Sequence, residues 1–94
     1  MTTIRSSGEM SFFVYALKSK KDGSRYIGSG ENAEGRLRRH NAGDYRYTKG
    51  HCPWVLIYKE SFRNRSEAVK RERFLKSGVG RKQLKELLEK QGSS

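Results

Sequence analysis

Two short apolar runs joined by a polar turn constrain the fold of this chain more than any other feature. The runs occupy residues 12–17 and 25–30, and an Asp-Gly dipeptide lies between them. Strand-forming residues on both sides of such a dipeptide are typical of a β-hairpin. Side chains alternate between the faces of a strand, so any register whose paired residue numbers sum to an odd value places Tyr15 and Tyr26 on one face.

The length of the hairpin loop decides how closely the two tyrosine rings approach. A two-residue loop of Asp22 and Gly23 meets the odd-sum condition, and so does a longer loop that sets Tyr15 directly opposite Tyr26. Side chains on neighbouring strands come closest when they are directly opposite. Of these two registers, only the one with the longer loop is expected to bring the rings into contact.

The remaining patterns predict an α/β chain of the α+β kind, in which a small three-stranded antiparallel sheet is flanked by helices. The strand at 12–18 is apolar on both faces, which is typical of a central strand, and the apolar run at 54–58 predicts another buried strand. Capping and stop residues bound the helices. The predicted elements are strands 12–18 and 24–29, a helix 32–41, a loop 44–52, a strand 54–58, and helices 65–76 and 81–90.

Length and composition predict one domain over residues 12–90, with flexible tails at 1–11 and 91–94. Four Phe, five Tyr and one Trp supply the aromatic area for a core in a chain of 94 residues. No apolar run approaches transmembrane length, and the N-terminal segment lacks the apolar stretch of a signal peptide. The single cysteine, Cys52, excludes an internal disulfide, so we expect a cytoplasmic, reducing location.

The charge of the chain points to a polyanionic partner. Lys and Arg number 21 against 10 Asp and Glu, which gives a formal net charge of +11. A protein this basic attracts nucleic acid. A membrane surface is the other polyanion to consider, but the basic residues are spread over loops and helices and no long amphipathic helix carries them. We therefore expect nucleic acid as the partner, and no membrane.

The first predicted helix carries two polar residues on one face. Arg36 and His40 are four residues apart and therefore share a face of the helix at 32–41. That face adjoins the stripe of Ala33 and Leu37, which turns the two polar residues towards the margin of the sheet. Taken singly, an arginine here is usually a solvated charge and a histidine is favoured by the helix C-terminus.

Glu72 is an unusual residue in the second predicted helix. It lies between Ala68 and Leu75 at the spacing i, i+4 and i+7, within the apolar stripe of its own helix. A carboxylate in such a stripe costs free energy unless it has a partner. The structural alternative to a functional role is an ion pair with Arg71 or Arg73.

Read in order, these residues resemble the GIY-YIG nuclease superfamily over about residues 12–76. The first motif is degenerate and keeps only its tyrosine, in Phe13-Val14-Tyr15, while the second is literal in Tyr26-Ile27-Gly28. A triplet of this kind occurs by chance in many strands, whereas the ordered set is specific. The residues that carry the resemblance are Tyr15, Tyr26, Arg36, His40 and Glu72. Short stand-alone members of the superfamily, which end in a segment like Lys76–Arg81, are the most similar.

The resemblance implies a metal-dependent endonuclease that hydrolyses DNA phosphodiester bonds, with DNA rather than RNA as substrate. It implies catalytic roles for Tyr15, Tyr26, Arg36 and His40, and one Mg²⁺ or Mn²⁺ held by Glu72. The products would carry 5′-phosphate and 3′-hydroxyl ends. A role in DNA repair and a protein partner for targeting are further expectations.

The same residues fit the chemistry without reference to the family. Phosphodiester hydrolysis needs a deprotonated water, neutralisation of the charge on the phosphate and help for the leaving oxygen. Glu72 offers a carboxylate for one Mg²⁺ that keeps several waters, and Arg36 offers a permanently charged fork for the phosphate. Tyr15 accepts or relays the proton of the water if its pKa is lowered by Arg36, His40 or the metal. Tyr26 positions the water or a phosphate oxygen.

Further polar residues extend the predicted nucleic-acid surface through phosphate contacts or base stacking. They are Ser29, Arg39, Tyr45, Tyr47, Lys49 and His51. Two alternatives remain open. A basic binding module without catalytic activity also explains the charge, and the degenerate first motif and the lack of an asparagine after Asn64 favour weak cleavage. A zinc site of His40, His51 and Cys52 lacks the usual ligand spacing and is less favoured.

Overall fold

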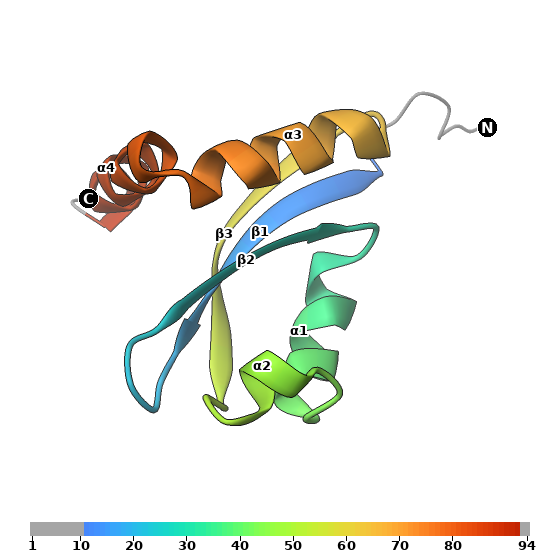
Figure 1. The fold of residues 1–94 in the computed structure, drawn as a ribbon, viewed down its shortest axis with the longest axis vertical. Helices are drawn as coiled ribbons and strands as arrows, with labels where there is room; N and C mark the ends of the chain where they lie inside the picture. The colour runs from blue at the N-terminus through green and yellow to red at the C-terminus, as the bar shows by residue number, and fades with distance from the viewer. Residues whose placement is uncertain (1–10, 93–94) are drawn as a thin grey trace.

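The sheet is built around the first strand of the chain. The computed structural model describes residues 11–92, and its strands lie in the order β2-β1-β3 (Figure 1). The central strand β1 (Phe12–Ser19) pairs antiparallel with both β2 (Arg25–Gly30) and β3 (Trp54–Phe62). The predicted three-stranded antiparallel sheet is confirmed, and so is the central place of the first strand, whose apolar run needs cover on both faces.

The hairpin adopts a register that differs from both predicted registers. Tyr15 pairs with Gly28 and Leu17 pairs with Tyr26, so the two tyrosines are diagonal neighbours. Their ring centroids are nonetheless 6.5 Å apart, because diagonal positions lie within reach of aromatic side chains. The observed register lies between the two predicted ones, and it too brings the rings close together. The paired numbers still sum to an odd value, and both rings belong to one cluster on one face.

Two helices begin where their capping residues predict. α1 (Ala33–Asn41) is capped by Asn32 and α3 (Arg65–Lys76) is capped by Asn64. In both cases the cap side chain accepts a hydrogen bond from the backbone N–H three residues later, which satisfies a donor that the first helical turn leaves free. Gly43, with a φ of +84°, follows the end of α1. The predicted helices at 32–41 and 65–76 are thus confirmed.

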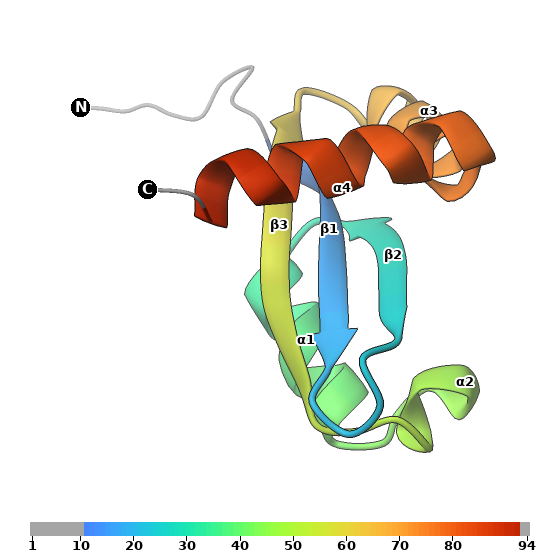
Figure 2. The ribbon, with the colours of Figure 1, turned by 90° about the vertical axis from the view of Figure 1, so that its left-hand side faces the viewer.

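Helices cover both faces of the sheet, and the alternation of β1 sorts its side chains between them (Figures 1 and 2). Val14 and Ala16 pack with residues of α3 and of α4 (Gly78–Gly92) on one face. Tyr15 and Leu17 pack with α1 on the other face. Helices contribute further buried side chains to these clusters. They are Ala68, Leu75 and Leu84 on the first face and Ala33 on the second.

The third strand lies at the edge of the sheet and is longer than predicted. β3 runs through Phe62, and Trp54 is its only fully buried side chain among the described residues of the strand. Val55 is 37% exposed. An apolar run such as 54–58 was expected to be buried, but a strand with one neighbour and partial helix cover leaves alternate side chains at the surface.

The other differences from the predicted elements are local. The predicted loop at 44–52 contains a short helix, α2 (Arg46–Lys49). α4 begins at Gly78 rather than at residue 81, and it continues through Gly92, two residues beyond the predicted end of the helix. Residues 1–10 and 93–94 of the predicted tails lie outside the described residues. Between residues 11 and 92, no helix is long and apolar enough to cross a membrane.

Candidate active site

Four of the five residues that carry the family resemblance gather on the α1 face of the sheet. β1 supplies Tyr15, β2 supplies Tyr26, and α1 supplies Arg36 and His40. The ring of Tyr26 lies 4.8 Å from that of His40 between centroids, and the ring of Tyr15 lies 6.2 Å from it. Residues from three successive elements therefore form one aromatic and basic cluster.

Tyr15 is a buried phenol. Only 1% of the residue is exposed, and its Oη lies 3.4 Å from Nε2 of His40. Burial, followed by the neighbouring Tyr26, raises the pKa of Tyr15 well above its usual range, and Arg36 only partly opposes this shift. A lowered pKa was the condition for Tyr15 to accept a proton by itself, and the surroundings of Tyr15 in the protein without metal do not meet it. Tyr15 is a neutral hydrogen-bonding group at neutral pH.

His40 is held by a residue that the sequence did not single out. Its Nδ1 lies 2.8 Å from Oγ1 of Thr48, which is itself buried in α2. The ring also lies 4.3 Å from that of Tyr45 between centroids. Burial and then the charge of Arg36 lower the pKa of His40, so its neutral form is favoured. A single threonine in a polar loop carries no motif, and only the fold brings it to His40.

The lowered pKa of His40 predicts that the protein loses stability in mild acid. The folded state binds the proton of His40 less tightly than the unfolded chain does, so its contribution is full above the ordinary histidine pKa and is lost as the pH falls through the folded pKa. The free energy of unfolding should fall between pH 7 and pH 5 by at most about 1.4 kcal/mol per unit. Urea denaturation of the wild type and of His40→Gln measures this effect. Equal pH slopes for both proteins would contradict it.

Glycines in β2 make room for the side chains of the cluster. A Cβ at Gly28 would lie 2.7 Å from Oη of Tyr15 and 3.0 Å from the ring of Tyr26. A Cβ at Gly30 would lie 2.9 Å from Nε of Arg36. The phenol and the guanidinium thus lie directly over the backbone of this strand, where only a glycine leaves space. The literal glycine of the second motif is a packing requirement for Tyr15.

Gly28→Ala is expected to destabilise the protein by about 1–3 kcal/mol, because the added methyl group displaces the Tyr15 ring from a packed site. The matched control is Gly50→Ala, where a Cβ would meet nothing within 4 Å and the change should stay within about 0.5 kcal/mol. Urea denaturation of both variants measures the difference. A similar small effect for both would show that the ring of Tyr15 moves freely.

Glu72 lies on the opposite face of the sheet from the two tyrosines. Its Oε1 accepts a hydrogen bond of 2.5 Å from the hydroxyl of Ser29, and its Oε2 pairs at 2.8 Å with Nζ of Lys76. Only 20% of the Glu72 side chain is exposed. The expected alternative partner Arg71 pairs instead with Glu60 at 3.0 Å. The ion pair of Glu72 is thus within its own helix, one turn onward.

The edge strand β2 connects the two halves of the candidate site. Side chains alternate along a strand, so Gly28 and Gly30 face Tyr15 and Arg36 while Ser29 faces Glu72. β2 is the outermost strand on this side, and only its backbone separates the two sets. The charge of Glu72 contributes to the raised pKa of Tyr15, after the larger effects of burial and nearer groups. The five residues therefore straddle one sheet edge.

Glu72 is the carboxylate of this region that could take part in a divalent-metal site. Among residues 11–92, no group of three or more His, Cys, Asp or Glu side chains is placed to hold a metal. Mg²⁺ often binds through one or two carboxylates together with waters and substrate phosphates. Glu72, oriented by Ser29, fits that mode. The three residues of the zinc alternative each form other hydrogen bonds. His40 is bonded to Thr48 and His51 to Asp22. Cys52 donates to the carbonyl of His40.

The predicted nucleic-acid residues are divided between several places. Tyr45 joins the cluster, with its Oη 3.4 Å from Nη1 of Arg36. Arg39 lies on the exposed side of Tyr45, 5.6 Å from the ring centroid, and pairs with Asp44 at 3.3 Å. Lys49 is exposed at the end of α2. The hydroxyl of Ser29 donates a hydrogen bond to the carboxylate of Glu72, so its predicted contact with nucleic acid would compete with this bond.

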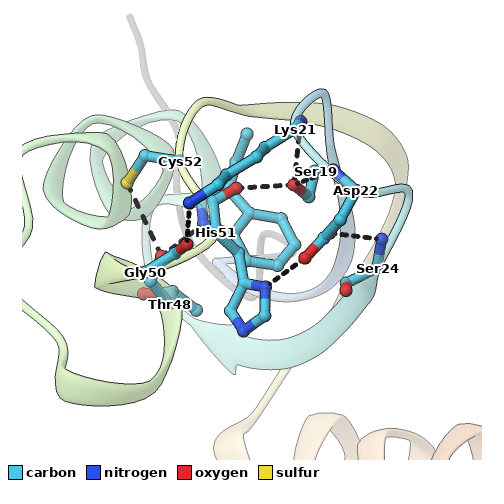
Figure 3. Close-up of polar contacts among 9 residues, drawn as sticks. Ser19, Lys21, Asp22, Ser24, Thr48, Gly50, His51 and Cys52 are labelled. Carbon is cyan, nitrogen blue, oxygen red and sulfur yellow. Dashed lines mark hydrogen bonds and ion pairs between the residues drawn. The ribbon is translucent and has the colours of Figure 1, made fainter.

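His51 joins two loops at the far end of the sheet (Figure 3). Its Nδ1 lies 2.6 Å from Oδ2 of Asp22, and the hydroxyl of Ser19 donates to its carbonyl at 2.6 Å. Lys21 Nζ donates to the carbonyl of Gly50 at 3.1 Å. These bonds connect the hairpin loop to the segment before β3. His51 thus has a structural role that its sequence context did not reveal.

Comparison with known proteins places these observations in a family. Residues 11–85 match the family described as the GIY-YIG catalytic domain. A UPF0213 protein of Staphylococcus haemolyticus is 42% identical over 79 residues, which cover 83% of this chain and 95% of that protein. A UPF0213 protein of Staphylococcus aureus is 38% identical over 81 residues, covering 85% of this chain and 98% of that protein.

A solved structure is similar as well. The solution NMR structure of a UPF0213 protein from Bacillus halodurans has a TM-score of 0.50 and 33% sequence identity, and the match covers 81% of this chain and 83% of that chain. The match thus extends over most of both chains.

Proposed function

The chain belongs to the GIY-YIG catalytic-domain family, and on that premise we propose that it is a divalent-metal-dependent endonuclease that hydrolyses DNA phosphodiester bonds. The observation that supports this proposal is the edge of β2. Three consecutive residues of that strand contact the phenol of Tyr15, the carboxylate of Glu72 and the guanidinium of Arg36. A strand edge is open to a polymeric substrate, unlike a closed pocket.

Tyr15 and His40 form the proposed proton relay. Because burial keeps the phenol neutral, Tyr15 cannot accept a proton unless it passes its own onward. Neutral His40, with its proton on Nδ1 towards Thr48, has Nε2 free to accept from Tyr15. The attacking water gives its proton to Tyr15 as Tyr15 gives its proton to His40. Thr48 is a positioning residue for this step.

Arg36 and Glu72 complete the proposed division of roles. The guanidinium of Arg36 lies over the glycine backbone and binds the phosphate, whose negative charge grows during the reaction. Glu72 would hold the metal, and Ser29 orients its carboxylate. When bound, Mg²⁺ or Mn²⁺ lowers the pKa of a coordinated water and neutralises phosphate charge. Tyr26, packed against both His40 and Tyr15, positions the water or a phosphate oxygen.

The ion pair between Lys76 and Glu72 should compete with the metal. Lys76→Met removes a cation that lies 2.8 Å from Oε2 of Glu72. Partly exposed ion pairs are worth up to about 1 kcal/mol, so the Mg²⁺ concentration for half-maximal cleavage should fall about two- to fivefold. Titration of the cleavage rate with Mg²⁺ measures this shift, and Lys70→Met elsewhere on α3 is the control. An unchanged midpoint for Lys76→Met would show that the pair already opens freely.

A cleavage assay tests the proposed activity against the alternative of a binding module. Single-stranded, duplex and branched DNA are incubated with the protein in Mg²⁺, in Mn²⁺ and in EDTA. The nuclease proposal predicts metal-dependent products with 5′-phosphate ends, which DNA ligase can join. The net charge of +11 alone explains binding. Binding of all three substrates without cleavage of any would therefore favour the binding module.

A further inference from the structure

A basic groove runs along the outer edge of β2, beside the candidate active site. Its volume is about 510 Å³. Figure 2 shows this edge of the sheet between α2 and the junction of α3 with α4. The residues that line it are Ser24, Arg25, Tyr26, Ile27, Tyr47, Lys76, Arg81 and Leu84. Tyr26 belongs both to this groove and to the cluster around His40, so the two sites are continuous.

The charge of the groove favours an anionic ligand. Three of its lining residues are cationic and none is acidic. Arg25 and Arg81 form no ion pair with any residue in the described part of the chain, whereas Lys76 is paired with Glu72. Two guanidinium groups without a carboxylate partner are suited to phosphate groups, which they can bind through two parallel hydrogen bonds.

An exposed aromatic ring lies at one side of the groove. Tyr47 is 59% exposed, and its ring centroid is 6.2 Å from that of Tyr26 and 5.2 Å from that of His51. His51 is itself held by Asp22, and the neighbouring Thr48 is buried against His40. The ring of Tyr47 is therefore supported from within the protein while more than half of the residue remains available to a ligand.

We propose that this groove binds a single strand of DNA next to the scissile phosphate, with a base stacked on Tyr47 and phosphates bound by Arg25 and Arg81. This inference rests on the proposed nuclease function. Stacking on an aromatic side chain needs a base whose face is uncovered, which a single strand provides and an intact duplex does not. A groove of this volume is in the range that encloses small-molecule ligands, so it accommodates about one or two nucleotides rather than the width of a duplex.

Binding of labelled DNA without cleavage tests the stacking contact. Fluorescence anisotropy in EDTA compares a single-stranded oligonucleotide with a duplex of the same sequence. Tyr47→Ala should weaken single-strand binding about tenfold and duplex binding less than about twofold. Tyr47→Phe keeps the ring and should bind like the wild type. Equal losses for single strand and duplex, or no loss for either, would overturn the inference.

The salt dependence of binding tests the phosphate contacts. Each lost contact with a single strand should reduce the slope of log K against log salt by about 0.7. Arg81→Ala and Arg25→Ala are each expected to show this reduction. Lys82→Ala, at an exposed position of α4 outside the groove, is the matched control and should show less. A reduction for Lys82→Ala as large as that for Arg81→Ala would show that charge alone is responsible and would overturn the inference.

The two proposals fail in different experiments. All binding measurements are made without metal, so the single-strand preference and its dependence on Tyr47 are expected even if the protein cleaves nothing. If the protein cleaves DNA but its Tyr47→Ala variant binds a single strand like the wild type, the nuclease proposal stands. The proposed binding of a single strand in the groove is then overturned.

Discussion

Glu72→Gln is expected to reduce metal-dependent DNA cleavage by about a thousandfold or more. The substitution preserves the shape of the side chain and an oxygen for the hydroxyl of Ser29, but it removes the negative charge that a divalent cation needs. Without the cation, the charge that develops on the phosphate is no longer neutralised, and the pKa of the attacking water is no longer lowered. Single-turnover cleavage rates at saturating Mg²⁺ measure the effect.

The control for Glu72→Gln is Glu67→Gln, an exposed carboxylate near the start of the same helix. Its cleavage rate should stay within about twofold of the wild type, since surface substitutions away from special features usually have small effects. Circular dichroism establishes that both variants are folded. Full activity of folded Glu72→Gln would remove Glu72 from the reaction and, with it, the proposal of a metal held by one carboxylate.

Arg36→Lys is expected to reduce the cleavage rate by about 10²–10³-fold while leaving the fold intact. The lysine keeps the positive charge but loses the planar fork that binds two phosphate oxygens at once. Loss of a single charge-stabilising donor in an active site has an effect of this size. The reduction should appear in the maximal rate more than in the DNA concentration for half-maximal rate, because the contact strengthens as charge develops.

Arg38→Lys provides the comparison on the same helix. Arg38 is exposed, and its side chain forms no hydrogen bond or ion pair with the described residues of the cluster. Its replacement by another cation should therefore change the rate less than about twofold. Equal rates for Arg36→Lys and Arg38→Lys would mean that Arg36 contributes charge alone. Because Arg36 and Glu72 lie on opposite faces of the sheet, loss of activity in both variants would show that the reaction uses both sides of the β2 edge.

Local signals predicted most of the elements. Asn32 and Asn64 satisfy free N–H groups in the first turn of α1 and α3, and this chemistry depends only on residues a few positions apart. The start of α4 was missed because it follows α3 almost directly, at Gly78, which the sequence indicated only as a stop. The hairpin register was missed because the loop adopts neither of the two predicted lengths.

The candidate site was predicted as a set of residues but not as an arrangement. The order of the motifs identified Tyr15, Arg36 and Glu72, yet their spacing along the chain did not show that Glu72 lies across β2 from the others. Thr48 carries no motif and was found only through its contact with His40, which depends on how α2 packs on α1. Lys76 is different, because it lies four residues after Glu72 in the same helix, a local pairing that the prediction overlooked.

The sequence by itself determined where α1 and α3 begin, and it determined that Tyr15 and Tyr26 share a face in any hairpin register with an odd sum, because strand alternation is a property of the backbone. Only the tertiary structure decided the ionisation of Tyr15. The raised pKa comes first from burial, and burial is produced by segments that are distant in the chain. Short-range rules therefore identified the chemical groups of this site, whereas long-range packing decided their protonation, their partners and the side of the sheet on which each one acts.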